Sequence, residues 1–291
     1  MTKASTDRQL DYAERIRQNR RRRRMYRTTM TLFAVFALVF LGAAGGIFLQ
    51  LRQDWHDAQV YSGLSELVTD PTDPEETIPE EESTTKPPQD HIQEDKEEPG
   101  VLPRYQTVYG MNDDLFGWIT VEGTTLNYPV VHTPEDEEYY LRRGFDRKYS
   151  RSGVPFLDAD CKTGCGNYII YGHNMTNGTM FAPMIAYEER TFWETHPVIR
   201  FDTLYEKGEY EVVAAFYSRV FYKYETNVFR YYDYHDLTDP EIFREYVENV
   251  KEESIYDTGV NPEPGDQLIT LITCSYGMKN ERFVVVARKQ N

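Results

Sequence analysis

The stretch Leu268-Ile-Thr-Leu-Ile-Thr-Cys-Ser-Tyr-Gly-Met-Lys-Asn-Glu-Arg-Phe-Val-Val-Val-Ala-Arg288 contains two apolar runs separated by a polar loop. The first run is rich in β-branched residues and ends on Cys274. The second run, residues 283–287, begins directly after Arg282. Runs of this composition on either side of a short polar loop predict two strands joined by a turn.

Antiparallel pairing of these strands would place Cys274 opposite Arg282, with their Cα atoms roughly 5 Å apart. A fixed positive charge beside a cysteine favours the thiolate, which is the nucleophilic form. The same guanidinium can stabilise the oxyanion that forms when a thiolate attacks a carbonyl. A buried structural cysteine beside a surface arginine explains these two residues equally well, because free cysteine is among the most buried residue types.

A third apolar run, Gly166-Asn-Tyr-Ile-Ile-Tyr-Gly-His-Asn-Met175, delivers His173 at the end of a predicted strand. Together, this YGHNM sequence, the TLITC that ends on Cys274 and the arginine eight residues later resemble the sortases, and class B sortases in particular. The GWI, YPVV and FLD sequences upstream also resemble that class. The resemblance covers about residues 101–291.

Sortases are cell-surface cysteine transpeptidases, so the resemblance implies a catalytic set and a fold. The catalytic set would be His173, Cys274 and Arg282, and Leu141, Thr273 and Ser275 are candidates for the substrate groove. The implied fold is mainly β: a closed eight-stranded β-barrel with peripheral helices, preceded by one transmembrane helix. The family requires no cofactor, and the sequence indicates no metal site.

The resemblance also implies the reaction and its partners. Cys274 would cleave an NPxTx- or PxTG-like C-terminal sorting motif of a secreted protein after Thr. An amine of a cell-wall precursor such as lipid II would then resolve the thioester. Three alternatives remain open: polymerisation of pilins, simple hydrolysis by a cysteine peptidase, and an inactive surface-anchored binding module with a sortase-like barrel.

Composition alone predicts a mainly β domain with helices. Short β-like runs occur at residues 117–121, 126–131, 154–157, 168–171, 198–201 and 210–216, in addition to the two strands that carry Cys274 and Arg282. Residues 239–253 have apolar positions at helical spacing, with Asp239 as a cap and Pro240 at the first helical position. Residues 105–112 suit a short helix or a turn.

The N-terminal part of the chain predicts a membrane anchor. Residues 1–27 contain ten Lys or Arg against three acidic residues, and residues 28–51 carry no charge. About 20 apolar residues span a bilayer, and the basic flank stays cytoplasmic. Small residues at 42–46 would also suit a cleaved signal peptide, but the apolar run continues past them. We therefore expect an uncleaved single-pass anchor, with the catalytic domain extracellular.

The remaining boundaries follow from charge and composition. The chain has a formal net charge of −16, and residues 69–100 are rich in Asp, Glu and Pro. Such a segment cannot bury enough apolar surface to fold, so we expect an acidic disordered stalk there. Residues 52–68 would be a juxtamembrane segment, and residues 101–291 the sortase catalytic domain. The acidic outer part argues against nucleic acid as a partner.

Other chemistries have weaker support. Cys161 and Cys165 precede His173 by a short distance, but three zinc ligands at this spacing leave the fourth unnamed. A reversible disulfide closing the loop is favoured outside the cell, with two unpaired thiols as the alternative. A G-x-S-x-G serine elbow does not occur in the sequence. The papain order is reversed, because Cys274 follows the histidine.

Overall fold

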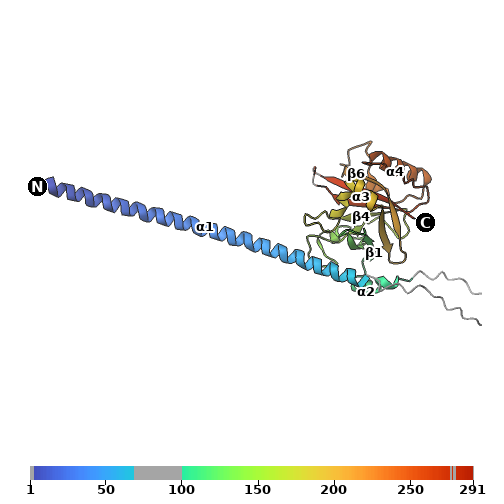
Figure 1. The fold of residues 1–291 in the computed structure, drawn as a ribbon, viewed down its shortest axis with the longest axis horizontal. Helices are drawn as coiled ribbons and strands as arrows, with labels where there is room; N and C mark the ends of the chain where they lie inside the picture. Colours follow the sequence, from blue (N-terminus) through green and yellow to red (C-terminus); the bar gives the residue numbers. More distant parts are fainter. Residues whose placement is uncertain (1–2, 69–99, 276, 278–279, 291) are drawn as a thin grey trace, which may run out of the picture. The chain divides into compact units, whose positions relative to one another are not determined.

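The computed structural model describes residues 3–68, 100–275, 277 and 280–290. In these residues the chain forms eight strands, four α-helices and three short 3₁₀ segments (Figure 1). The elements in chain order are α1 (Lys3–Val68), α2 (Pro103–Met111), β1 (Leu115–Thr120), β2 (Asn127–Val131), η1 (Tyr139–Arg142), β3 (Phe156–Leu157), β4 (Asn167–Gly172), η2 (Ala182–Glu188), α3 (Arg190–Thr195), β5 (Val198–Thr203), β6 (Glu209–Arg219), η3 (Tyr231–Asp233), α4 (Pro240–Glu253), β7 (Leu268–Cys274) and β8 (Glu281–Lys289).

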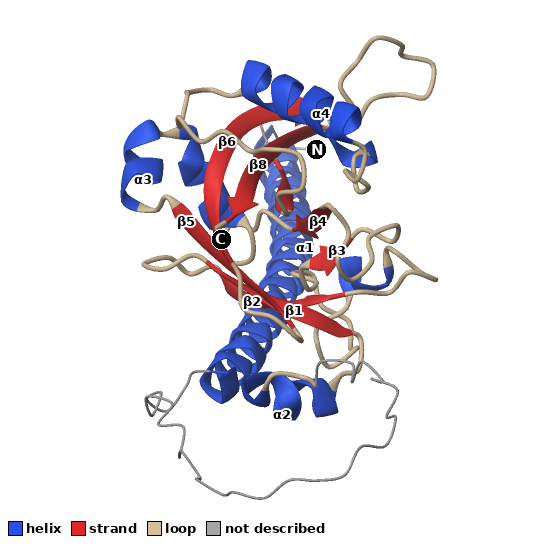
Figure 2. Ribbon diagram, turned by 90° about the vertical axis from the view of Figure 1, so that its right-hand side faces the viewer, coloured by secondary structure: helices blue, strands red, loops and turns tan. Residues whose placement is uncertain are grey.

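The eight strands form one sheet in the order β1-β2-β3-β4-β7-β8-β6-β5. Figure 2 shows the strands of this sheet in red. The sheet closes on itself as a barrel, because β1 pairs with β2 on one side and with β5 on the other. Two pairs are parallel, β2 with β3 and β4 with β7, and the others are antiparallel. Each of the eight predicted strands is present, so the prediction of a mainly β fold with eight strands is confirmed.

The strands that carry the candidate cysteine and arginine are buried almost along their whole length. Helix α4 packs against the neighbouring strand β6, and its Tyr246 hydroxyl lies 2.5 Å from the Thr270 hydroxyl of β7. The helix begins where the sequence predicts, because Asp239 accepts a hydrogen bond of 2.7 Å from the backbone N–H of Glu241. Burial on both faces explains why β7 is a continuous apolar run rather than an alternating one.

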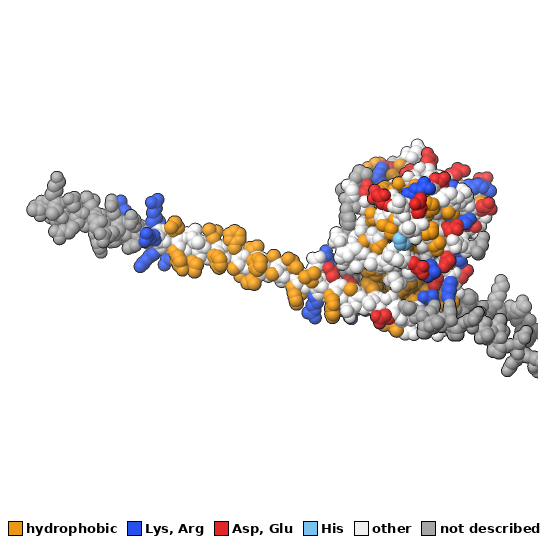
Figure 3. All heavy atoms as spheres, in the orientation of Figure 1, with side chains coloured by type: hydrophobic (Ala, Val, Ile, Leu, Met, Phe, Trp, Pro, Cys, Tyr) orange, Lys and Arg blue, Asp and Glu red, His pale blue; other side chains and the backbone are white. Residues whose placement is uncertain are grey.

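The chain divides into two compact units, residues 1–56 and residues 57–291. In the first unit, basic side chains of α1 are followed along the helix by hydrophobic side chains that are exposed (Figure 3). In the part of the chain that the structure describes, one helix, Arg20–Val68, is long and apolar enough to cross a membrane. It is a candidate membrane span and includes the apolar stretch at residues 28–51.

The second unit begins at residue 57, before the start that the sequence suggests. Tyr61, Leu64 and Val68 of α1 are spaced so that they lie on one face of the helix. All three are buried in this unit. The sequence predicts a juxtamembrane segment at residues 52–68, and the last turns of α1 within that segment pack into the hydrophobic core of the second unit. The predicted acidic stalk falls on residues 69–99, which lie outside the described residues, and on Gly100.

Candidate active site

The ends of three strands meet at one edge of the barrel. Strand β7 pairs with β8 so that Cys274 stands directly opposite Arg282. Strand β4 runs parallel to β7, with Gly172 opposite Thr273. His173 follows Gly172 immediately, and so the chain emerges from β4 at the same edge as Cys274. The topology therefore brings together three residues that are far apart in the sequence.

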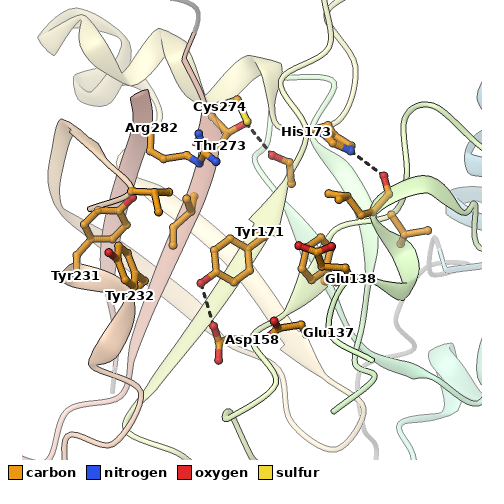
Figure 4. Close-up of a pocket in the computed structure, with 16 residues that line it drawn as sticks. Glu137, Glu138, Asp158, Tyr171, His173, Tyr231, Tyr232, Thr273, Cys274 and Arg282 are labelled. Atoms are coloured by element: carbon orange, nitrogen blue, oxygen red, sulfur yellow. Dashed lines mark hydrogen bonds between the residues drawn. The ribbon is translucent and has the colours of Figure 1, made fainter. Parts of the chain in front are cut away.

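These side chains line a pocket of about 440 Å³ (Figure 4). Cys274 and Arg282 lie next to each other at one end of the pocket, and His173 lies across from Cys274. Leu141 and Thr273 also line the pocket. Ser275 is not among the described residues that line it, and its backbone N–H instead donates to the Glu281 carbonyl at 3.1 Å. The structure thus places five of the six predicted site residues in one cavity.

A hydrogen bond fixes the orientation of the histidine ring. His173 Nε2 lies 2.8 Å from the backbone carbonyl oxygen of Leu141. A carbonyl oxygen only accepts hydrogen bonds, so Nε2 carries the proton and Nδ1 is left for proton transfer. Burial lowers the pKa of His173, and the hydrogen bond to Leu141 opposes this only in part. The imidazole is therefore mainly neutral at pH 7.

Two further hydrogen bonds hold the cysteine end of β7 against the histidine segment. The Thr273 hydroxyl, which is buried, donates to the Gly172 carbonyl at 2.8 Å. The Asn174 side-chain amide donates to the Cys274 carbonyl at 2.9 Å. Thr273 therefore lines the pocket while its hydroxyl binds the backbone of β4. Asn174 was not singled out from the sequence, although it directly follows the histidine.

Gly172 is required at its position by close packing rather than by backbone conformation. A Cβ atom at this residue would overlap the aromatic ring of Phe181. The Phe181 N–H donates to the His173 carbonyl at 2.9 Å, so the ring and the histidine backbone are held together. A side chain at residue 172 would displace the segment that carries His173.

The rest of the pocket lining is tyrosine-rich and partly acidic. Tyr171 donates a hydrogen bond of 2.9 Å to Asp158, and both residues line the pocket. Burial raises the pKa of Tyr231, which also lines the pocket, and the charge of Arg282 opposes that rise. The positive charge of Arg282, which lies beside Cys274, therefore also acts on Tyr231 in the pocket wall. Tyr171 and Asp158 belong to the YGHNM and FLD sequences, whereas the sequence signals Tyr231 only through its overall abundance of Tyr.

Cys161 and Cys165 lie away from this pocket and are free thiols in the structure, rather than the disulfide expected from the sequence. Their Sγ atoms lie 3.4 and 3.2 Å from the carbonyl oxygen of Asn167. A hydrogen bond between the two thiols raises the pKa of Cys161 and lowers that of Cys165. Among the described residues, no group of three or more His, Cys, Asp or Glu side chains is arranged to hold a metal.

The known proteins that this chain resembles in sequence are sortases. Residues 119–290 match the sortase domain family. The chain is 32% identical to sortase B of Staphylococcus aureus over 197 residues, which is 66% of this chain and 77% of that protein. It is 34% identical to sortase B of Listeria monocytogenes over 166 residues, covering 56% of this chain and 64% of that protein.

The fold is similar to that of solved sortase B structures. A Staphylococcus aureus sortase B–substrate complex superposes with a TM-score of 0.66 at 25% identity, covering 82% of this chain and 99% of that chain. The family match spans more than half of the sequence, and the first relative is matched over most of its length. The chain therefore belongs to the sortases, the family of cysteine transpeptidases, and within that family to class B.

Proposed function

We propose that this class B sortase cleaves an NPxTx- or PxTG-like sorting motif of a secreted protein after Thr and joins the new carboxyl end to a cell-wall precursor amine such as that of lipid II. The observation that carries this proposal is the register of β7 and β8, which sets Cys274 opposite Arg282 in the pocket that also contains His173. Polymerisation of pilins would use the same chemistry with a pilin lysine as the amine.

In the first half of the reaction, His173 Nδ1 takes the proton of the Cys274 thiol, and the resulting thiolate attacks the carbonyl carbon of the motif's Thr. The carbonyl oxygen takes up the electron pair and is stabilised by the Arg282 guanidinium. When the tetrahedral intermediate collapses, the C–N bond after Thr breaks and a proton from His173 passes to the leaving amine. Because Nε2 is bound to Leu141, Nδ1 is the nitrogen that exchanges this proton. The product is a thioester on Cys274.

In the second half, an amine attacks the thioester carbonyl and the C–S bond breaks. Neutral His173 accepts the proton that the amine loses, and the Cys274 thiolate is regenerated. The lowered pKa of His173 supports this base role, since most of the imidazole is unprotonated at pH 7. Water in place of the amine would give hydrolysis.

A peptide screen tests this proposal directly. The full chain in detergent micelles is incubated with a library of quenched sorting peptides, with and without an amine acceptor. We expect cleavage after Thr in NPxTx- or PxTG-like motifs and a ligated product when the amine is present. Cleavage without ligation at saturating amine would favour a hydrolase. An absence of cleavage across the library would favour a binding module with a sortase-like barrel.

We also propose that α1 anchors the enzyme with residues 1–27 in the cytoplasm and the catalytic unit outside. The basic residues before the apolar stretch support this orientation through the positive-inside rule. A protease added to intact cells should therefore remove the barrel and spare an epitope placed at the N-terminus. Lysed cells provide the control, because both parts become accessible there. Protection of the barrel in intact cells would contradict the orientation.

Replacing both Cys161 and Cys165 by Ser should leave most of the transpeptidation rate. Neither thiol lines the pocket, and the two side chains contact the Asn167 backbone instead. A disulfide across this short loop would contribute at most about 3 kcal/mol to stability, so a small decrease in Tm is compatible with this expectation. The rate with an optimal peptide and amine is the measurement.

The matching control for the double variant is metal analysis of the purified wild-type chain. Stoichiometric zinc that is lost in the double variant, together with a large decrease in rate, would contradict the assignment of these cysteines to a noncatalytic loop.

A further inference from the structure

We propose that Asp57 and Tyr61, near the end of α1, are positioning residues for His173: they hold the turn at residues 150–153 against the Leu141 carbonyl that binds the imidazole. This role rests on the proposed function, because it concerns the histidine of the same site. It assigns to the last turns of the anchor helix a part in the geometry of the active site, in addition to their place in the hydrophobic core.

The helix presents one face to the barrel. Asp57, Tyr61, Leu64 and Val68 are spaced by four, three and four residues, and each is at most 7% exposed. This spacing places all four on the same side of an α-helix. The ring of Tyr61 packs edge-on against Tyr128 of β2, with ring centroids 5.3 Å apart. This contact fixes the position of the Tyr61 ring, and therefore the position of its hydroxyl.

Two side chains of this face hold the turn from one side. The Tyr61 hydroxyl donates to the Gly153 carbonyl at 2.5 Å. Asp57 accepts a hydrogen bond of 2.6 Å from the Ser150 hydroxyl. The Ser150 oxygen in turn accepts from the N–H groups of Ser152 and Gly153, at 3.1 and 3.2 Å. The turn is therefore closed by a hydroxyl whose own orientation is set by a carboxylate of α1.

The other side of the turn lies against the histidine and its partner. Gly153 has φ of +61°, and a Cβ there would lie 2.6 Å from the Tyr140 carbonyl oxygen and 3.0 Å from that of Leu141. The same Cβ would lie 3.3 Å from His173 Cδ2. The backbone of Gly153 is thus packed directly against both members of the Leu141–His173 hydrogen bond. A shift of the turn would change the distance between the Leu141 carbonyl oxygen and His173 Nε2.

Burial of the Asp57 carboxyl group distinguishes this contact from simple apolar packing. A buried carboxylate is costly unless hydrogen bonds compensate for the loss of water. An apolar residue at this position of the helix stripe would pack without that cost. Asp57 is compensated by a bond to the turn that supports Leu141, so the polar group sits where it controls the backbone next to His173. Networks of buried hydrogen bonds are rigid when every donor and acceptor in them has a partner.

The test compares three substitutions in the full chain in detergent micelles. Tyr61→Phe keeps the ring against Tyr128 and removes only the hydroxyl, and Asp57→Ala removes the acceptor for Ser150. Asp57→Asn keeps an acceptor oxygen and should restore most of the rate. We expect Tyr61→Phe and Asp57→Ala to lower kcat for peptide cleavage about tenfold, equivalent to about 1.4 kcal/mol of barrier, with KM nearly unchanged.

The second readout is the ¹⁵N spectrum of the His173 imidazole, assigned by comparison with His173→Gln. The wild-type chain should show a protonated Nε2 and an unprotonated Nδ1, whereas Tyr61→Phe and Asp57→Ala should show a mixture of the two tautomers. Leu64→Ala is the matched control, since Leu64 lies on the same face of the helix and is similarly buried. It should lower Tm without changing the tautomer.

Unchanged kcat and an unchanged tautomer in Tyr61→Phe and Asp57→Ala would overturn the positioning role. The same changes in Leu64→Ala would overturn it as well, because they would show a general effect of helix packing. A wild-type chain that cleaves no sorting peptide would overturn the proposed function. The positioning role would still be tested by comparing the His173 tautomer in the wild-type chain with that in the Tyr61→Phe and Asp57→Ala variants.

Discussion

Replacing His173 by Gln is expected to lower kcat about 10³-fold, within the usual range for loss of a general acid–base group. The Gln side-chain amide can still donate a hydrogen bond to the Leu141 carbonyl, which binds His173 Nε2 in the native site. It cannot take up or release a proton at pH 7. The substitution therefore removes proton transfer while keeping the group that fills this end of the pocket. Single-turnover cleavage of a sorting peptide measures the effect.

The pH dependence of amine transfer provides a check on the same role. Burial lowers the pKa of His173, so the neutral imidazole predominates above its usual value near 6.5. The rate of thioester resolution should fall as the pH drops below 6.5 and through that lowered pKa, because the base becomes protonated. The His173→Gln variant should lose this step in the profile. A variant that keeps wild-type turnover, or keeps the same pH profile, would contradict the assignment.

Replacing Arg282 by Lys is expected to lower kcat about 10²-fold, comparable with the loss of one oxyanion donor at about 3 kcal/mol. Lys keeps the positive charge opposite Cys274 but lacks the planar fork of donors. The variant therefore separates a charge effect on the thiol from hydrogen bonding to the motif and the oxyanion. Transpeptidation kinetics with the best sorting peptide distinguish the two roles.

Arg219→Lys is a matched control for this experiment. Arg219 lies at the end of β6 and forms an ion pair with Glu225, and it is not among the described residues that line the pocket. It should keep nearly full activity. Near-wild-type transpeptidation by Arg282→Lys, with an unchanged melting curve, would leave Arg282 as a charged neighbour of Cys274 without a role in binding the oxyanion.

The strands and the long helix could be predicted from the sequence because their signals are local. The runs that end on Cys274 and begin after Arg282 are apolar and β-branched, and they form β7 and β8 with the expected register. Asp239 and Pro240 mark the start of α4. The order in which strands pair is not a local property. A closed barrel was implied by the family resemblance alone, and the pairing of β1 with β5 that closes it is seen only in the structure.

Two features of the site could not be predicted because they depend on tertiary contacts. Leu141 lines the pocket, and its backbone carbonyl also binds His173. The second contact could not be predicted, because every residue has the same backbone carbonyl. From the sequence, residues 52–68 are predicted only to be a juxtamembrane segment. Their buried stripe is recognisable only once the barrel that covers it is known.

The proposed function requires that a thioester form on Cys274. The most direct measurement is the intact mass of the full chain after rapid mixing with its best sorting peptide at low amine concentration, followed by acid quenching. We expect an adduct on Cys274 with the mass of the peptide segment that ends on Thr. Added amine should discharge this adduct, and the Cys274→Ala variant should not form it. Rapid cleavage of the peptide with no adduct on Cys274, or cleavage by the Cys274→Ala variant, would contradict the proposed function.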